Sequence, residues 1–250
     1  FGKEVFGGTG RNVFNPALIG RAFLQAAFPA ALTTWPLPTG AALEGGGTMA
    51  WATLRGGNFA LPLMGSNVDA LTGATPLGLR KFEEVTTPVG DLFMGTIPGS
   101  IGETSALLIL AGGVVLALRG YLDWRIPVSV LLSVAVLSSA LHALKPDALP
   151  GAPFMLFSGG LMLGAVYMAT DMVTSPVTPR GAWVYGAGIG ALVVVIRYWG
   201  GLPEGVMYAI LIMNAFVPFI ERVTQPRVFG TARTRGGRGA RRERAGQGAT

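Results

Sequence analysis

Two threonine hydroxyls lie close together in the stretch VDALTGATPLG, residues 68–78, at Thr72 and Thr75. Gly73 between them can adopt backbone conformations that are closed to other residues. Pro76 pushes Thr75 toward an extended backbone, which holds its side chain away from the turn. The hydroxyl of a threonine presented in this way can be esterified, although an ordinary turn explains the same residues. The residues alone therefore leave both hydroxyls open as candidates.

The sequence contains no recognisable motif for hydrolysis, metal binding or nucleotide binding. No Ser-His-Asp grouping, metal-ligand cluster or phosphate-binding loop is recognisable, and GGTG at residues 7–10 lacks the strand and the acidic partner of a dinucleotide fingerprint. The absence of cysteine removes disulfides and thiolate ligands for zinc or an iron–sulfur cluster. We therefore expect no metal site, and any redox cofactor that the chain holds is expected to be organic.

Ionisable residues in or beside apolar segments form a second group of candidates, because such residues are functional by default in a membrane. The candidates for an ion path are Asp171, Glu103 and Glu204. Helix capping also explains two of these acids, Glu103 through a capping box with Ser100, and Glu204 at a helix start. Arg21 can snorkel or pair with an acid. The lone His142 is expected to be a hydrogen-bonded core residue rather than a ligand.

The elements that position these residues are expected to be membrane helices. Half of the residues are hydrophobic and 13% are charged, against roughly 25% charged in soluble domains. Long uncharged stretches approach the ~20 residues that cross a bilayer. We expect an all-α polytopic membrane protein with about six transmembrane helices and a long outer loop at 36–97. The expected spans are 15–35, 104–118, 126–144, 153–170, 181–196 and 205–220.

Helix starts next to glycine-rich sequence suggest that some of these helices are interrupted. Asn15-Pro16 and Ser175-Pro176 each combine a capping side chain with proline at the first helical position. Pro203-Glu204 places an acid where the helix dipole favours negative charge. Half-helices of this kind build midplane sites in many transporters.

The basic residues of the short loops predict the orientation, because Lys and Arg tend to face the cytoplasm. Arg119 and Arg125 in one connection, Arg180 in another, and the C-terminal end are assigned to the inner side. The loop 36–97 then lies outside. Residues 231–250, with six Arg and one Glu, are expected to form a disordered cytoplasmic tail near anionic lipid rather than a nucleic-acid-binding segment.

Five motifs together resemble a known family of membrane subunits. They are GGTGRNVFNPALIGRAFL, DALTGATPL, IPGSIGETSALLIL, GGLMLGAVYMATDMVTSPVTPRG and GGLPEGVMYAILIMNAFVPFIER. Residues 1–227 are similar to the D subunit of Rnf ion-translocating electron-transport complexes and to the B subunit of the sodium-translocating NADH:quinone oxidoreductase. The last motif leans toward the Rnf subunit. The family's additional N-terminal helices do not precede GGTG here, so we expect the chain to be a fragment.

The resemblance implies a covalent cofactor. The last threonine of the family's motif carries FMN through a phosphoester, and by position that residue is Thr75. The flavin site would include Thr72, Gly73, Ala74 and Asp69, and a flavin transferase would load it.

The resemblance also implies a function for the whole assembly. The chain would be one subunit of a redox-driven ion translocase, inactive alone, in the bacterial inner membrane. It would relay electrons between ferredoxin and NAD, coupled to Na⁺ or H⁺ movement, together with the other subunits of the complex. The alternatives are the quinone reductase subunit and a flavin-free transporter or channel.

Overall fold

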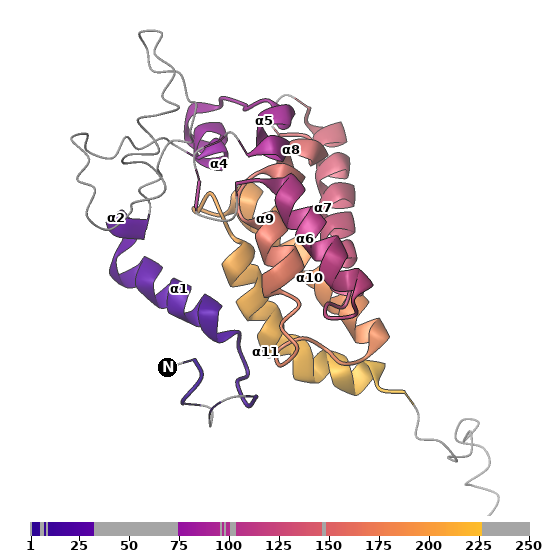
Figure 1. Cartoon of the computed structure of the whole chain (residues 1–250). Coiled ribbons are helices and arrows are strands. Elements are labelled where there is room, and N and C mark those ends of the chain that lie inside the picture. The colour runs from indigo at the N-terminus through magenta and orange to yellow at the C-terminus, as the bar shows by residue number, and fades with distance from the viewer. Residues whose placement is uncertain are drawn as a thin grey trace, which may run out of the picture.

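The structure is a computed structural model, and all regular elements among its described residues are helices (Figure 1). It describes residues 2–5, 8, 10–32, 75–95, 97, 99–100, 104–146 and 149–226. The expected tail 231–250 and most of the expected outer loop lie outside these ranges. Within them the architecture is the all-α membrane protein that the sequence predicts.

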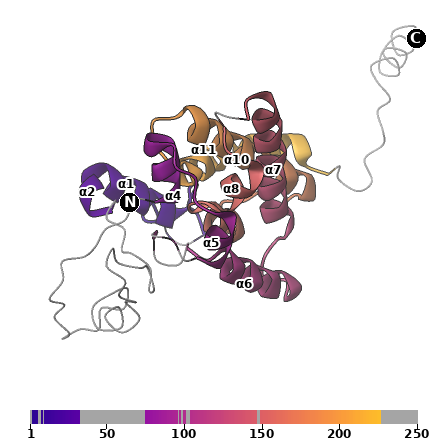
Figure 2. The same cartoon turned by 90° about the horizontal axis from the view of Figure 1, so that it is seen from above.

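Three long helices form the centre of the molecule. α7 (Arg125–Leu144), α10 (Pro179–Trp199) and α11 (Val206–Thr224) have 20, 21 and 19 residues, and each is apolar enough to cross a bilayer. At 1.5 Å per residue these lengths match a hydrocarbon layer of about 30 Å. α10 packs against both α7 and α11 and lies between them when seen from above (Figure 2). Of the other elements, α1 (Pro16–Ala27) packs against α11, α8 (Ala152–Phe157) against α7, and the π-helix η2 (Gly164–Met168) against both α7 and α11.

Glycines and serines bring α7 and α10 into close contact. The hydroxyls of Ser129 and Ser133 donate to the carbonyls of Trp183 and Ala187, at 2.7 and 3.1 Å. One turn apart on α10, Gly186 and Gly190 face the same two serines, and a Cβ on Gly190 would stand 2.7 Å from the Cβ of Ser133. Small residues at this spacing let membrane helices approach closely, which is how such helices associate in lipid.

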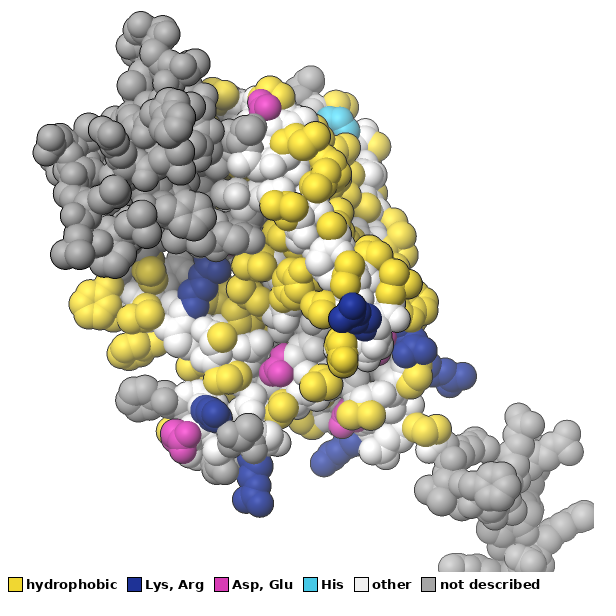
Figure 3. All heavy atoms as spheres, in the orientation of Figure 1, with side chains coloured by type: hydrophobic (Ala, Val, Ile, Leu, Met, Phe, Trp, Pro, Cys, Tyr) yellow, Lys and Arg dark blue, Asp and Glu magenta, His cyan; other side chains and the backbone are white. Residues whose placement is uncertain are grey.

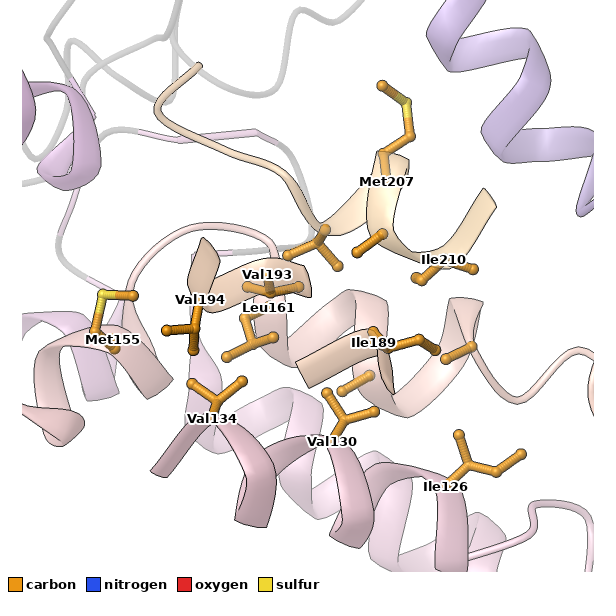
Figure 4. Packing of buried hydrophobic residues seen from close by; sticks show 14 of the residues in the cluster. Ile126, Val130, Val134, Met155, Leu161, Ile189, Val193, Val194, Met207 and Ile210 are labelled. Carbon is orange, nitrogen blue, oxygen red and sulfur yellow. The ribbon is translucent and has the colours of Figure 1, made fainter. Parts of the chain in front are cut away.

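The hydrophobic core lies between the long helices. Val130 and Val134 of α7 meet Ile189 and Val193 of α10, and all four side chains are fully buried (Figure 4). Many large hydrophobic residues instead point outward, among them Leu108 and Leu118 of α6 (Ala106–Leu118), and Figure 3 shows such side chains covering much of the visible face. An exposed apolar surface of this extent suits a protein surrounded by lipid.

The crossing expected as one helix over 153–170 is interrupted. α8 (Ala152–Phe157) ends at Ser158, and the chain resumes as α9 (Leu161–Leu163), which continues into the π-helix η2 (Gly164–Met168). Gly159 adopts a φ of 62° in the gap, a conformation that favours glycine. Two half-helices therefore make up the segment expected as a span, in keeping with the interrupted helices that the sequence predicts.

The first crossing is also divided. α1 (Pro16–Ala27) stops at Phe28, and the short helix α2 (Pro29–Leu32) follows. The predicted cap at Asn15 is confirmed, because its side chain accepts from the amide of Ala17 at 3.0 Å. Its amide group donates to the carbonyl of Met168, at the end of η2, at 3.1 Å. The cap therefore also ties α1 to the interrupted crossing.

Two other predicted helix starts were wrong. α10 begins with Thr178 as N-cap and not with Ser175, since the Thr178 hydroxyl accepts from the amide of Gly181 at 3.1 Å. α6 begins with Ser105 as N-cap, whose hydroxyl accepts from the amide of Leu108, and not with a capping box at Ser100. In both cases the helix starts a few residues later than expected.

Part of the expected outer loop is helical. Residues 76–94 form α4 (Pro76–Gly78), the π-helix η1 (Leu79–Glu83) and α5 (Val89–Met94). In Figure 1 this segment lies at the end of the bundle where α8 begins, opposite the end from which α10 starts. It is the part of the fold that carries Thr75.

Candidate functional site

Thr75 is the N-cap of α4. Its backbone is extended, with φ −68° and ψ 152°, and its Oγ1 accepts a hydrogen bond from the amide of Gly78 at 3.2 Å. Pro76 occupies the first helical position, as expected for a residue without an amide proton. The extended conformation agrees with the restriction that proline places on its predecessor. Thr72, Gly73, Ala74 and Asp69 lie outside the described residues.

The residues after Thr75 fasten this segment to the membrane helices. Leu77 is 7% exposed and belongs to the main hydrophobic cluster. Lys81 donates from its ammonium to the carbonyls of Arg197, Gly200 and Leu202. Desolvation lowers the pKa of Lys81 below its ordinary range. These contacts place Thr75 at the end of the bundle where α10 finishes, which is the end that the loop charges assign to the outer side.

The gap between α8 and α9 is occupied by a charge pair. Arg197 of α10 is 5% exposed and donates to the carbonyls of Met155 and Ser158 at 2.6 and 2.9 Å. Glu204 accepts from the amide of Gly160 at 2.5 Å, and its carboxylate oxygen lies 3.8 Å from the Arg197 guanidinium. The cation therefore meets the carbonyl end of one half-helix and the anion meets the amide end of the next, as the helix dipole favours.

This geometry corrects the reading of Glu204 as the start of the following helix. α11 begins at Val206 with Gly205 before it, and the Glu204 side chain reaches across to Gly160 instead. Arg197 is buried in the last turn of α10, and the sequence alone did not single it out. Only one local signal pointed to it, a single arginine within the apolar run VVVIRYW.

A cavity of about 220 Å³ is lined by residues of η1, of α8 and of the last turn of α10. Its wall is apolar where Leu77 and Phe154 contribute, and polar or charged where Arg80, Lys81 and Tyr198 contribute. The Tyr198 hydroxyl is held by the carbonyl of Pro150 at 2.9 Å. The cavity therefore borders α4 and η1, the helices that follow Thr75.

Asp171 lies far from Thr75 along the bundle, in the connection between η2 and α10. Its carboxylate accepts from the Thr174 hydroxyl at 3.0 Å, and its carbonyl accepts from the amides of Thr174 and Ser175. Asp171 thus shapes a turn, and Glu204 is not part of its surroundings. Glu103 lies outside the described residues.

A buried polar group between α10 and α11 was not anticipated. The hydroxyl of Tyr185 and the side chain of Asn214 are 2.6 Å apart, and both residues are almost fully buried. With the Asn214 amide turned to satisfy its neighbours, its oxygen accepts from the backbone amide of Asn15 at 3.1 Å. The group joins α1, α10 and α11 inside the apolar core, where unpaired polar atoms are costly.

Two remaining candidates have structural surroundings. His142, near the end of α7, bonds through Nδ1 with the carbonyl of Leu149 at 2.6 Å, which confirms the predicted hydrogen bond although the residue is only half-buried. Arg21 is half-buried on α1.

The fold and the interrupted crossing define an integral membrane protein built of helices and half-helices. The chain belongs to the NQR2, RnfD, RnfE family, whose sequence pattern it matches over residues 1–230. It is 43% identical to the D subunit of the ion-translocating oxidoreductase complex of Stutzerimonas stutzeri, over 92% of this chain and 66% of that protein.

Two further relatives carry more specific names. The chain is 40% identical to the D subunit of the proton-translocating ferredoxin:NAD(+) oxidoreductase complex of Clostridium ljungdahlii, over 92% of this chain and 65% of that protein. It is 39% identical to the D subunit of the Na(+)-translocating ferredoxin:NAD(+) oxidoreductase complex of Acetobacterium woodii, over 92% of this chain and 63% of that protein. The chain therefore spans just under two thirds of the length of these relatives.

Proposed function

We propose that the chain is the membrane-embedded part of the D subunit of an Rnf-type complex. In that complex it relays electrons between ferredoxin and NAD, coupled to translocation of Na⁺ or H⁺ across the bacterial inner membrane. The observation that carries this proposal is the 39–43% identity, over 92% of the chain, to D subunits from three organisms. The names of two of them include ferredoxin and NAD(+), one with protons and one with sodium as the transported ion.

We propose further that Thr75 carries FMN through a phosphoester, attached by a flavin transferase. The local geometry fits this group. In the N-cap, Oγ1 accepts from the Gly78 amide, the one contact it makes among the described residues, and a phosphoester loses the hydroxyl proton but keeps acceptor oxygens. The existing hydrogen bond therefore does not depend on the proton that esterification removes. Bound there, FMN would supply the transfer of one or two electrons.

The chain's own residues would hold and orient this group. Thr75 supplies the oxygen of the ester, and the Gly78 amide donates toward it. Pro76 and Leu77, both buried, fix the direction in which the segment leaves Thr75. The wall of the neighbouring cavity carries the cationic side chains of Arg80 and Lys81 and the carboxylate of Glu84.

The flavin assignment is tested by replacing Thr75 in the purified complex. We expect Thr75→Ala to abolish flavin fluorescence of this subunit after denaturing electrophoresis, because alanine offers no oxygen for the ester. Thr75→Ser should retain it, since serine keeps the hydroxyl. Thr86→Ala, at an exposed threonine of the same segment, is the matched control and should also remain fluorescent. A Thr75→Ala subunit that still fluoresces would falsify the assignment.

The electron partners are tested on the same complex, in membranes or after purification. We expect NAD reduction that depends on reduced ferredoxin and is accompanied by ion movement into sealed vesicles. Quinone-dependent oxidation of NADH in place of this activity would instead assign the chain to the quinone reductase. Solute flux through a complex that contains no flavin would contradict both redox assignments.

A further inference from the structure

Lys81 joins the Thr75 segment, residues 75–85, to the end of α10 through three hydrogen bonds. Its ammonium lies 3.3 Å from the carbonyl oxygen of Arg197, 2.5 Å from that of Gly200 and 2.8 Å from that of Leu202. An ammonium has three N–H donors, so each proton can meet one carbonyl. The side chain thereby links residues that are more than one hundred positions apart in the sequence.

The three carbonyls are a natural target for a cation. They belong to the last turn of α10 and to the residues that follow it, where a helix leaves carbonyl groups without internal partners and carries partial negative charge. Burial costs an ammonium its hydration, and the contacts with the three carbonyls compensate for this loss. Lys81 therefore supplies donors for carbonyls at this helix end.

A second contact holds the start of the same segment, through the side chain of Leu77. Leu77 lies against the gap between α8 and α9, where a Cβ added to Gly159 would stand 2.5 Å from the Leu77 Cδ1. The same hypothetical Cβ would lie 3.0 Å from the Glu204 carboxylate. The absence of a side chain at Gly159 thus makes room for Leu77. Together, Leu77 and Lys81 hold the two ends of the α4–η1 helix.

We propose that Lys81 is a positioning residue for the flavin, clamping the Thr75 segment to the end of α10 so that the cofactor keeps a fixed place at the membrane surface. The proposal rests on the proposed flavin at Thr75. It predicts that loss of the three carbonyl contacts loosens residues 75–85 without removing the hydroxyl to which the flavin is bound. A loosened segment would hold the flavin at variable distances from its redox partners.

The clamp itself is tested by hydrogen exchange on the whole purified complex, independently of any flavin. Lys81→Met keeps a long side chain but removes the donors, and we expect at least tenfold faster amide exchange in residues 79–85. Lys81→Arg keeps charge and donors and should restore slow exchange at least in part. Lys145→Met is the matched control, because Lys145 is an exposed lysine at the end of α7, outside the segment, and its loss should leave exchange in residues 79–85 unchanged. Unchanged exchange in Lys81→Met overturns the proposal.

The consequence for the cofactor is tested by the mobility of the bound flavin and by turnover. We expect lower flavin fluorescence anisotropy in Lys81→Met, and ferredoxin-dependent NAD reduction lowered by about tenfold, since a misplacement of about 1 Å can cost about 10²-fold in rate. Lys81→Arg should recover both. Faster exchange with unaltered anisotropy and turnover would reject the positioning role, whereas a wild-type subunit without covalent flavin would reject the flavin assignment and leave the exchange result standing.

Discussion

Arg197 and Glu204 meet where the α8–α9 crossing is interrupted, and their contacts show what each charge does there. The guanidinium is held by two carbonyls of the crossing, and the carboxylate by the Gly160 amide and the guanidinium. A transported cation at Glu204 would share the carboxylate with an arginine that is already held in place. The Arg197 side chain is 1% exposed and the Glu204 side chain 27%, so loss of the carboxylate would leave a buried cation without its anion, which is costly. The pair is therefore better suited to stabilise the half-helices than to exchange ions.

Asp171 differs from Glu204 in this respect, because its carboxylate accepts from the Thr174 hydroxyl and has no ion pair among the described residues. We predict that Asp171→Asn weakens the coupling of ion movement to electron transfer more than Glu204→Gln does. The measurement is the ratio of ions taken up by vesicles to NAD reduced. The same ratio in both variants and in the wild type would remove these acids from the coupling mechanism.

At the scale of elements, the α7–α10 interface depends on the lack of side chains at Gly186 and Gly190. A Cβ on Gly190 would lie 2.8 Å from the carbonyl oxygen of Val130 and 2.7 Å from the Cβ of Ser133. Neither atom is the flexible end of a long side chain, so the helices themselves must move apart. The hydrogen bonds of Ser129 and Ser133 to α10 would lengthen as a result.

We predict that Gly190→Ala destabilises the protein by about 1–3 kcal/mol, the usual cost of overpacking a tight contact. Gly20→Ala on α1 is the matched control, because a Cβ there meets nothing within 4 Å and alanine favours the helix. The measurement is the thermal transition of the purified complex. Equal transitions for the two variants would show that the close approach of α7 and α10 is not needed.

Several elements followed from the sequence, and the reasons for the others are physical. The long uncharged stretches and the Asn15 cap depend on local chemistry and were predictable. The gap at Ser158–Gly160 was not, since SGG lies in an apolar run and becomes a helix break only when Arg197 and Glu204 supply partners for its carbonyls and amide.

The start of α10 gives a second example. Ser175-Pro176 and Thr178-Pro179 offer the same local cap three residues apart. The Thr178 hydroxyl lies 2.6 Å from the hydroxyl of Thr224 on α11, a tertiary contact that no local pattern contains. The same distinction applies to the candidate site. The motif alone indicated Thr75, whereas the role proposed for Lys81 depends on its tertiary contacts with the end of α10.

At the scale of the whole molecule, the basic residues predict which end of the bundle faces the cytoplasm. Most of the Lys and Arg side chains visible in Figure 3 lie toward the end opposite α4 and α5. That end includes the connection of Arg119 and Arg125, between α6 and α7. The Thr75 segment lies at the other end, bound to the last turn of α10.

We predict that this orientation can be read by labelling, because the chain contains no cysteine. Tyr121 and Val177 are 71% and 84% exposed at the basic end, and Phe82 is 71% exposed on η1. A membrane-impermeant maleimide added to intact cells should label Phe82→Cys but not Tyr121→Cys or Val177→Cys. In inverted vesicles the pattern should reverse. Labelling of Tyr121→Cys in intact cells would reverse the proposed orientation and place Thr75 inside.

The interrupted crossing also bears on how the chain is synthesised. α8 has 6 residues, and α9 with η2 has 8, so at 1.5 Å per residue each half covers about 9–12 Å of a bilayer. Neither half is long enough to enter lipid alone as a stable helix. The groups that complete the crossing, Arg197 and Glu204, emerge from the ribosome roughly forty residues later. We therefore expect α8 and α9 to remain in contact with the insertion machinery, and to enter the lipid only after α10 has been synthesised.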